Sequence, residues 1–317
     1  MSVGDAPPVR LGVLDVGSNT VHLLVVDAHR GARPLPIESH KEELRLTEHL
    51  LPNGAISRTG REQLVHAINS AIAAVADNQP DELLAFATSA LREASNGDEV
   101  LKEISEKCDI DLQVLSGDEE ARLTFLAVRR WFGWSSARLV VLDIGGGSLE
   151  VASGIDEEPE VAFSAPLGAS RLTTEFLSGD PFDSSDIKTL RRHVRTEIAK
   201  WVPDLLERGE IDHPVGTSKT FRSLARICGA APSTSGPFIP RLLMRDDLED
   251  LLPKLFTSTT EERVALPGVS AGRAQQLVAG AIVAHTVMDL LDIEALEICP
   301  WALREGIILR RLDWISH

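Results

Sequence analysis

The chain has 317 residues, of which 43% are hydrophobic and 25% are charged, a composition typical of globular domains. Its net charge of −16 comes from 48 acidic and 32 basic residues and disfavours nonspecific binding to nucleic acid. The cysteines, Cys108, Cys228 and Cys299, lack the spacing of a zinc site and exclude a disulfide framework. Residues 1–10 have no signal-peptide core and no apolar run reaches membrane-spanning length, so we expect a cytoplasmic protein with no membrane partner.

The first glycine motif, Leu14–His22, has the sequence Leu-Asp-Val-Gly-Ser-Asn-Thr-Val-His. Apolar residues in extended spacing flank it, so we expect a strand, a turn and a second strand. Alternation over residues 43–46 predicts a further strand containing Arg45, whose side chain is solvated or, as the family resemblance described below implies, faces a cleft. Thr59 and Glu62 have capping-box spacing and predict the start of a scaffold helix.

A predicted strand over residues 83–87 runs directly into Thr88 and Ser89, which precede a helix. Free N–H groups and hydroxyls at a helix N-terminus form an anion site. Arg92 lies one turn into this helix, where it can add a charge-assisted contact to a phosphate. The alternative is an ordinary helix cap followed by a surface arginine.

The segment Ser116–Arg122 starts another predicted helix, after a strand over residues 110–115. Ser116 and Glu119 fit a capping box, which explains Glu119 structurally. Two interpretations of Glu120 are open. It stabilises the helix dipole as a first-turn carboxylate, or it is a general base that takes a proton from an attacking water.

The second glycine motif, Leu142–Glu150, again indicates a strand, a turn and a strand. Its three glycines each cost roughly 0.5–1 kcal/mol relative to alanine, so the bare backbone must serve a purpose. Phosphate is the natural ligand, because N–H groups without side chains can surround an oxyanion, while Asp143 and Glu150 supply hard oxygens for Mg²⁺ (or Mn²⁺). The first motif aligns with this one 128 residues earlier (143 − 15), which indicates two similar domains.

Four basic residues follow Asp183, which is predicted to cap a helix, and lie on one face of that helix. We call this set the basic stripe: Lys188, Arg191, Arg192 and Arg195. It is either a solvated face or a path for a long polyanion leaving the active site. A Leu-Gly-Ala turn at residues 167–169 receives no chemical role from the sequence, and residues 270–291 predict one long helix.

The segment Gly216–Arg222 again suggests a strand, a loop and a helix, with Lys219, Arg222 and Arg226 on one helical face. The glycine and lysine pattern of a P-loop is absent, which excludes that class of nucleotide site.

The two glycine motifs resemble the phosphate hairpins of the actin, Hsp70 and sugar-kinase superfamily. Together with Ser116–Arg122 they are similar to the exopolyphosphatase and guanosine pentaphosphate phosphohydrolase (Ppx/GppA) family, in its short two-domain form. The resemblance implies an α/β fold of two actin-like (ribonuclease H-like) domains with an interdomain cleft, and a homodimer. The expected domains are residues 1–133 and 134–300, with a terminal helix at 301–317 returning to the first. Ser218 and Lys219 stand where the family usually has glycines, so a cationic side chain would replace a backbone contact there.

The resemblance further implies a hydrolase that releases orthophosphate processively from inorganic polyphosphate with Mg²⁺ (or Mn²⁺). Guanosine pentaphosphate is the alternative substrate, while a superfamily kinase or a phosphate sensor without catalysis is a weaker alternative. The family pattern places the catalytic glutamate at Glu120 and the metal on Asp143 and Glu150, with Asp15. The expected phosphate-binding residues are Gly17, Ser18, Asn19, Ser89, Arg92, Gly145, Gly146, Gly147, Ser148 and Lys219.

Overall fold

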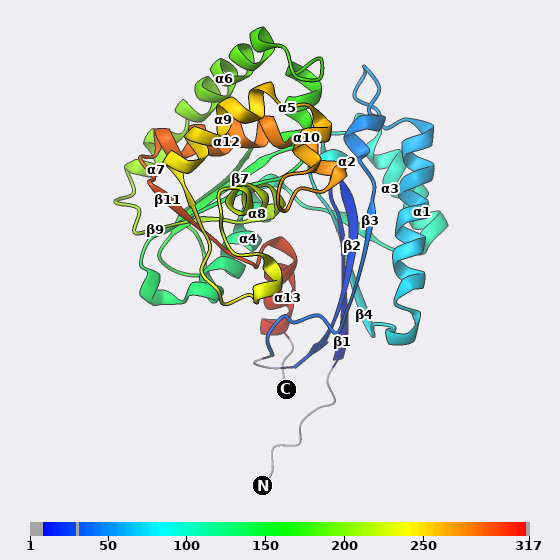
Figure 1. Ribbon diagram of the computed structural model, residues 1–317. Helices are drawn as coiled ribbons and strands as arrows, with labels where there is room; N and C mark the ends of the chain where they lie inside the picture. Colours follow the sequence, from blue (N-terminus) through cyan, green and yellow to red (C-terminus); the bar gives the residue numbers. More distant parts are fainter. Residues whose placement is uncertain (1–8, 30–31, 315–317) are drawn as a thin grey trace. The chain divides into compact units, whose positions relative to one another are not determined.

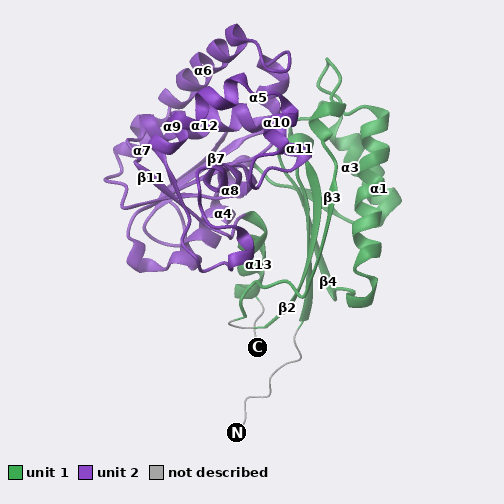
Figure 2. Ribbon diagram, in the orientation of Figure 1, with its two compact units in different colours: residues 1–116, 303–317 green, residues 117–302 purple. Residues whose placement is uncertain are grey.

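The computed structural model describes residues 9–29 and 32–314. Two expectations therefore fall partly outside the described residues. They concern the signal-peptide segment, through residues 1–8, and the terminal helix, through residues 315–317. The chain divides into two compact units, coloured separately in Figure 2. One unit runs up to Ser116 and resumes at Leu303, and the other spans Gly117–Ala302. The expected boundary at Gly133 is wrong because the helix that follows Ser116 packs on the strands of the second unit.

The first unit is built on a five-stranded sheet in the order β3-β2-β1-β4-β5. Its strands are β1 (Val9–Val16), β2 (Thr20–Ala28), β3 (Glu38–Glu43), β4 (Glu82–Ala87) and β5 (Leu112–Val114). The first three strands form an antiparallel meander, and β4 and β5 continue the sheet in parallel to β1. The first glycine motif is therefore the turn of the β1–β2 hairpin, as predicted.

Helices cover this sheet on both faces, with α1 packed on β2 and β3 and α13 on β1 (Figure 1). The helices of this unit are α1 (Arg58–Ala74), α2 (Ser89–Arg92), α3 (Gly97–Cys108) and α13 (Leu303–Trp314), with 3₁₀ turns η1 (Leu46–His49) and η2 (Ala76–Asn78). Helix α1 begins two residues before the predicted start, because Ser57 caps it by accepting a hydrogen bond from the Gly60 N–H.

Arg45 does not lie in a strand, contrary to prediction. Strand β3 ends at Glu43, and Arg45 has a left-handed backbone with φ of 49°. Its guanidinium pairs with Glu43 and Glu48 at 3.4 and 3.7 Å. Leu44 and Leu46 are both buried on either side of it, so the apparent alternation came from a packed turn and not from an extended strand.

The second unit is built on a six-stranded sheet in the order β10-β11-β9-β6-β7-β8. Its strands are β6 (Leu139–Ile144), β7 (Leu149–Gly154), β8 (Val161–Ala165), β9 (His213–Gly216), β10 (Leu242–Met244) and β11 (Ala295–Ile298). Strands β6 to β8 form an antiparallel meander, β9 and β11 run parallel to β6, and β10 adds an antiparallel edge. Five strands thus repeat the order and direction of the first sheet, which confirms the two similar domains expected from the paired motifs.

The helices of the second unit enclose its sheet, with α4 on one face and α5, α8 and α12 on the other. They are α4 (Gly117–Phe132), α5 (Ala169–Phe176), α6 (Ser184–Ala199), α7 (Val202–Leu206), α8 (Ser218–Ile227), α9 (Arg245–Thr257), α10 (Thr260–Val264), α11 (Ala271–Ala274) and α12 (Leu277–Leu290), with 3₁₀ turns η3 (Trp134–Ser136) and η4 (Ser233–Ser235). The prediction of a single helix over residues 270–291 is wrong, because this segment forms two helices, α11 and α12. It is broken before Leu277, where the Gln276 side chain accepts a hydrogen bond from Ser170 at 2.6 Å.

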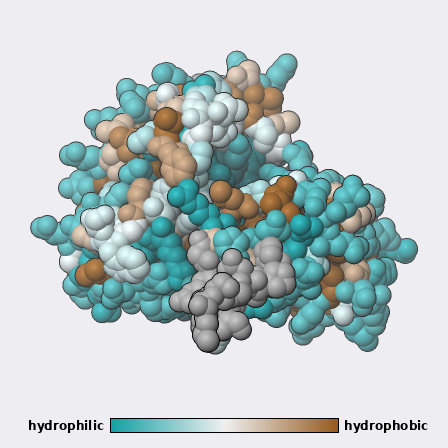
Figure 3. All heavy atoms as spheres, turned by 90° about the horizontal axis from the view of Figure 1, so that it is seen from below, coloured by the Kyte–Doolittle hydropathy of each residue, from teal (hydrophilic) through white to brown (hydrophobic). Residues whose placement is uncertain are grey.

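The face drawn in Figure 3 is mostly hydrophilic, and hydrophobic residues show on it in several separate groups. In the part of the chain that the structure describes, no helix combines the length and the apolar character needed to cross a membrane.

Candidate active site

The turn between β6 and β7 has a distinctive backbone arrangement. The Gly145 N–H closes the turn by donating to the Ser148 carbonyl at 2.9 Å. The carbonyls of Gly145 and Gly146 point away from the turn's opening, because they accept the N–H groups of residues 169–171 at the start of α5 at 3.0 Å. Helix α5 therefore holds the turn in place by three hydrogen bonds.

The opposite side of this turn is lined with hydrogen-bond donors. Among the residues that the structure describes, no acceptor faces the N–H groups of Gly146, Gly147 and Ser148. Successive N–H groups without acceptors form a concave nest that binds anions. The Ser148 hydroxyl adds a donor from a residue that is only 3% exposed.

Gly168 is a functional residue that the sequence did not reveal. A Cβ at this position would lie 2.2 Å from the Gly147 carbonyl carbon, 2.3 Å from the Ser148 nitrogen and 2.4 Å from the Gly146 oxygen. All three are backbone atoms, which cannot swing aside as a side chain can. Only glycine lets α5 approach the turn closely enough to hold it. The signal for this residue was the Leu-Gly-Ala turn itself, but its partner atoms lie about 20 residues earlier.

The β1–β2 turn in the first unit is built in the same way. Gly17 donates to the Thr20 carbonyl at 3.0 Å, and the carbonyls of Ser18 and Asn19 accept the N–H groups of residues 44–46. Arg45 therefore contributes its backbone N–H to the turn. The hydroxyl oxygens of Ser18 and Ser89 lie 3.1 Å apart and both residues are buried, so two predicted phosphate-binding residues do meet.

Two other residues of this unit, which were predicted to bind phosphate or metal, form hydrogen bonds within the protein. Arg92 donates to the Leu115 carbonyl at 2.9 Å and ties the end of β5 to α2. The Asp15 carboxylate accepts a hydrogen bond from Arg304 on α13 at 2.9 Å. A cation already faces one oxygen of Asp15, so this residue is a weaker candidate metal ligand than the pair in the second unit.

Asp143 and Glu150 form that pair. They are directly opposite one another on β6 and β7, so their side chains leave the same face of the sheet. Glu150 is 4% exposed and accepts a hydrogen bond from the Ser164 hydroxyl at 2.9 Å. Like charges directly opposite on adjacent strands are destabilising, and a bound cation would remove that cost.

The acidic pair fits a hard divalent cation. Mg²⁺ is usually held by one or two carboxylates together with water and substrate phosphates. Among the described residues no group of three or more His, Cys, Asp and Glu side chains is arranged to hold a metal ion, so its remaining ligands would be phosphate oxygens and water. A Cβ built on Gly145 would lie 3.9 Å from the Glu150 Oε2 atom, which places this carboxylate beside the glycine turn.

Glu120 lies in the first turn of α4, on the face of the sheet from which the acidic pair projects. Val141 and Ala152 lie two residues from Asp143 and Glu150 along their strands, so they share the same face of the sheet, and both pack against α4. A Cβ on Gly117 would lie 2.3 Å from the Ser164 Cβ, so the start of α4 contacts the residue that donates to Glu150. Glu120 is half-buried there, and this placement suits a base acting at the glycine turn.

Lys219 lies in the first turn of α8, which is bonded to the end of β6. The Thr217 N–H donates to the Leu142 carbonyl, and the Thr220 hydroxyl donates to the Ile144 carbonyl, each at 2.9 Å. These bonds fix the first turn of α8 against the last residue of β6 before the glycine turn. Burial, together with the neighbouring Arg222 and Arg273, lowers the pKa of Lys219.

The basic stripe lies on α6, which packs on α12 and α5 and forms an outer layer of the second unit (Figure 1). All four residues are exposed. Arg195 pairs with Asp289 at 2.6 Å, and Arg191 lies over the Phe256 ring at 5.9 Å. Lys188 and Arg192 have no ion-pair partner within the described ranges.

A family model described as the Ppx/GppA phosphatase family matches residues 24–314. The chain belongs to the Ppx/GppA phosphatase family. Over 305 residues it is 53% identical to Exopolyphosphatase 1 of Mycobacterium tuberculosis, which covers 96% of this chain and 89% of the relative.

Solved structures share the fold. A crystal structure of an exopolyphosphatase from Cytophaga hutchinsonii has a TM-score of 0.87 and 25% identity, covering 97% of this chain and 99% of that one. The Ppx/GppA family member of Aquifex aeolicus has a TM-score of 0.78 and 21% identity, covering 98% and 100%. These findings confirm the family resemblance and the fold of two actin-like domains.

Within this Ppx/GppA chain, the predicted residues gather in two groups. The second unit brings together the glycine turn, the acidic pair and Glu120, because α4 belongs to that unit, and it also contains Lys219 on α8. The first unit gathers the β1–β2 turn, Ser89 and Asp15. The basic stripe belongs to neither group, since α6 packs on other helices and not on a glycine turn.

Proposed function

We propose that the chain is an exopolyphosphatase that hydrolyses the terminal phosphoanhydride bond of inorganic polyphosphate and releases orthophosphate. One observation carries this proposal: a nest of three N–H groups without acceptors lies beside the acidic pair, of which Glu150 is buried, and α4 brings Glu120 to the same face of the sheet. The name of the 53% identical relative supports the same activity.

In this proposal each group has one role in the reaction. The N–H groups of Gly146, Gly147 and Ser148 hold the terminal phosphate and orient its phosphorus toward water. Glu120 takes the proton of that water as it attacks, and such a base contributes typically 10²–10⁴-fold to the rate. Asp143 and Glu150 hold Mg²⁺ (or Mn²⁺), and the ion, when bound, offsets the negative charge of the transferred phosphoryl group.

The processive action and the homodimer implied by the family resemblance belong to this proposal too, as does the cytoplasmic location expected from the lack of a signal-peptide core and of a membrane-spanning apolar run. The basic stripe favours the polymer over guanosine pentaphosphate, because several exposed cations along a helix suit a long polyanion better than one nucleotide. Its two residues without ion-pair partners in the described ranges, Lys188 and Arg192, are the ones available to such a chain.

The test is orthophosphate release by the purified protein, with short polyphosphate, long polyphosphate and guanosine pentaphosphate compared at equal concentrations of terminal phosphate. We expect rapid release from polyphosphate in Mg²⁺ and its loss on chelation. Release from guanosine pentaphosphate alone would make the protein a nucleotide phosphohydrolase. Tight binding of all three without release would indicate a sensor, and phosphate transfer to an acceptor other than water would indicate a kinase.

A further inference from the structure

Lys219 has an unusual electrostatic environment. It is half-buried in the first turn of α8, and within the described ranges it makes no hydrogen bond or ion pair. Burial, with the positive charges of Arg222 on its own helix and Arg273 on α11, lowers the pKa of Lys219. A partly buried ammonium surrounded by like charge is costly unless an anion offsets it. The surroundings of Lys219 therefore suit an anionic ligand.

The backbone before Lys219 is strained. Ser218 has a left-handed conformation with φ of 63°, which a residue with a Cβ adopts at a cost in energy. The Thr217 hydroxyl accepts the Ser218 N–H at 2.7 Å and stabilises this turn. Strained backbone of this kind persists mainly where it serves a functional site. Here it starts α8 so that Lys219 follows immediately, next to Thr220, whose hydroxyl donates to the Ile144 carbonyl at the end of β6.

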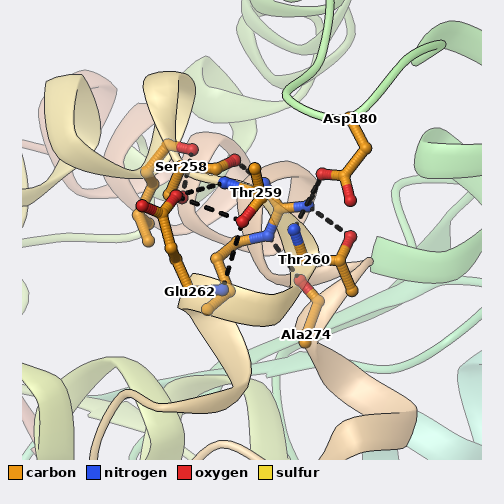
Figure 4. Close-up of polar contacts among 8 residues, drawn as sticks. Asp180, Ser258, Thr259, Thr260, Glu262 and Ala274 are labelled. Carbon is orange, nitrogen blue, oxygen red and sulfur yellow. Dashed lines mark hydrogen bonds and ion pairs between the residues drawn. The ribbon is translucent and has the colours of Figure 1, made fainter.

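Arg273 belongs to a rigidly held segment, and not to a loose surface loop. This segment, residues 258–274, packs on α8, where the Ser223 hydroxyl donates to the Gly268 carbonyl at 3.0 Å. Its anchor is Arg263, which is fully buried and stacks on the Phe182 ring at 4.7 Å. The Arg263 guanidinium donates to the acceptors labelled in Figure 4, which are the Ser258 and Ala274 carbonyls, the Thr260 hydroxyl and the Asp180 carboxylate.

We propose that Lys219, Arg222 and Arg273 form a second phosphate subsite, which binds the phosphate group next along the chain from the one held by the glycine turn. This inference rests on the proposed function and deepens it. Three cations match a substrate that carries a negative charge on every internal phosphate. The subsite selects for a chain of at least two phosphates over orthophosphate, and Lys219 is its specificity-determining residue.

The proposal is tested by calorimetric binding of orthophosphate, pyrophosphate and tripolyphosphate to the Glu120→Gln protein, which binds without rapid turnover. Adding Lys219→Gln should weaken tripolyphosphate binding by about 10- to 100-fold, the range for a charged hydrogen bond, and orthophosphate binding much less. Lys219→Arg should restore the affinity. Lys102→Gln removes an exposed charge on α3 in the first unit and is the matched control, with no change expected.

A pH profile gives a second readout that a structural role would not produce. The pKa of Lys219 is lowered, so its ammonium loses its proton at a lower pH than an ordinary lysine does. Tripolyphosphate affinity should therefore fall as the pH rises through that pKa, whereas the Lys219→Arg protein should retain its affinity over the same range.

The outcomes separate this inference from the proposed function. If the wild-type protein releases orthophosphate from polyphosphate but Lys219→Gln loses affinity equally for all three ligands, or for none, the subsite is refuted and the function stands. If the wild-type protein neither binds nor hydrolyses polyphosphate, the function itself fails. Unchanged binding of orthophosphate by Lys219→Gln shows that the variant is folded.

Discussion

Gly168→Ala tests how the glycine turn is held. The added Cβ would lie 2.2–2.4 Å from three backbone atoms of the turn, whereas non-bonded carbon atoms prefer separations of about 3.5–4.0 Å. The turn or the start of α5 must therefore move by about 1 Å. Overpacking of this kind costs typically 1–3 kcal/mol, and more where the surroundings cannot adjust. We expect the upper end of that range, because three hydrogen bonds tie the turn to α5.

The effect on catalysis should exceed the effect on stability. Misplacing the reacting groups by about 1 Å can lower the rate by about 10²-fold, so kcat for orthophosphate release should fall by at least that factor. The matched control is Gly133→Ala, where φ is +78° and nothing lies within 4 Å of the added Cβ. This control should lose about 1–3 kcal/mol of stability, because its φ of 78° and ψ of 177° lie in a backbone region that is essentially restricted to glycine, and it should keep its turnover. A folded Gly168→Ala protein with wild-type kcat would refute the role given to Gly168.

Three further predictions concern the second unit. The double variant Lys188→Gln/Arg192→Gln should raise KM for long polyphosphate more than for short chains, and an equal change for both lengths would argue against a path along the basic stripe. Arg263→Met leaves buried carbonyls without donors, so the free energy of unfolding in urea should fall by about 2–4 kcal/mol, and a loss below about 1 kcal/mol would contradict the anchoring role. Burial raises the pKa of Cys228 to about 11, so in the native protein Cys228 should react only slowly with iodoacetamide at pH 8. Alkylation of Cys228 is followed by mass spectrometry, and rapid alkylation would contradict this prediction.

The two glycine turns were predictable from the sequence because their signals are local. Alternating apolar residues determine the hairpin strands, and the glycines mark the turns between them. The residues opposite one another on β6 and β7, Asp143 and Glu150, follow directly from the length of the turn. The first turn of α4, which contains Glu120, could also be located from a local signal, the capping-box spacing of Ser116 and Glu119.

The features that the sequence did not reveal depend on contacts between distant residues. The alternation around Arg45 belongs to a turn, because the N–H groups of residues 44–46 bond to the β1–β2 turn and not to a neighbouring strand. The role of Gly168 depends on atoms of the glycine turn about 20 residues earlier. The break before α12 is stabilised by Ser170, more than 100 residues away. Tertiary contacts of this kind override local pattern.

The measurement that tests the account most directly compares Glu120→Gln with Glu119→Gln, two neighbouring residues in the first turn of α4. Orthophosphate release and polyphosphate affinity are measured for both variants. If Glu120 is the base, Glu120→Gln lowers kcat by about 10²–10⁴-fold with affinity retained, while Glu119→Gln keeps turnover near that of the wild type. Near-wild-type turnover by Glu120→Gln would contradict the account, because the base would then lie elsewhere.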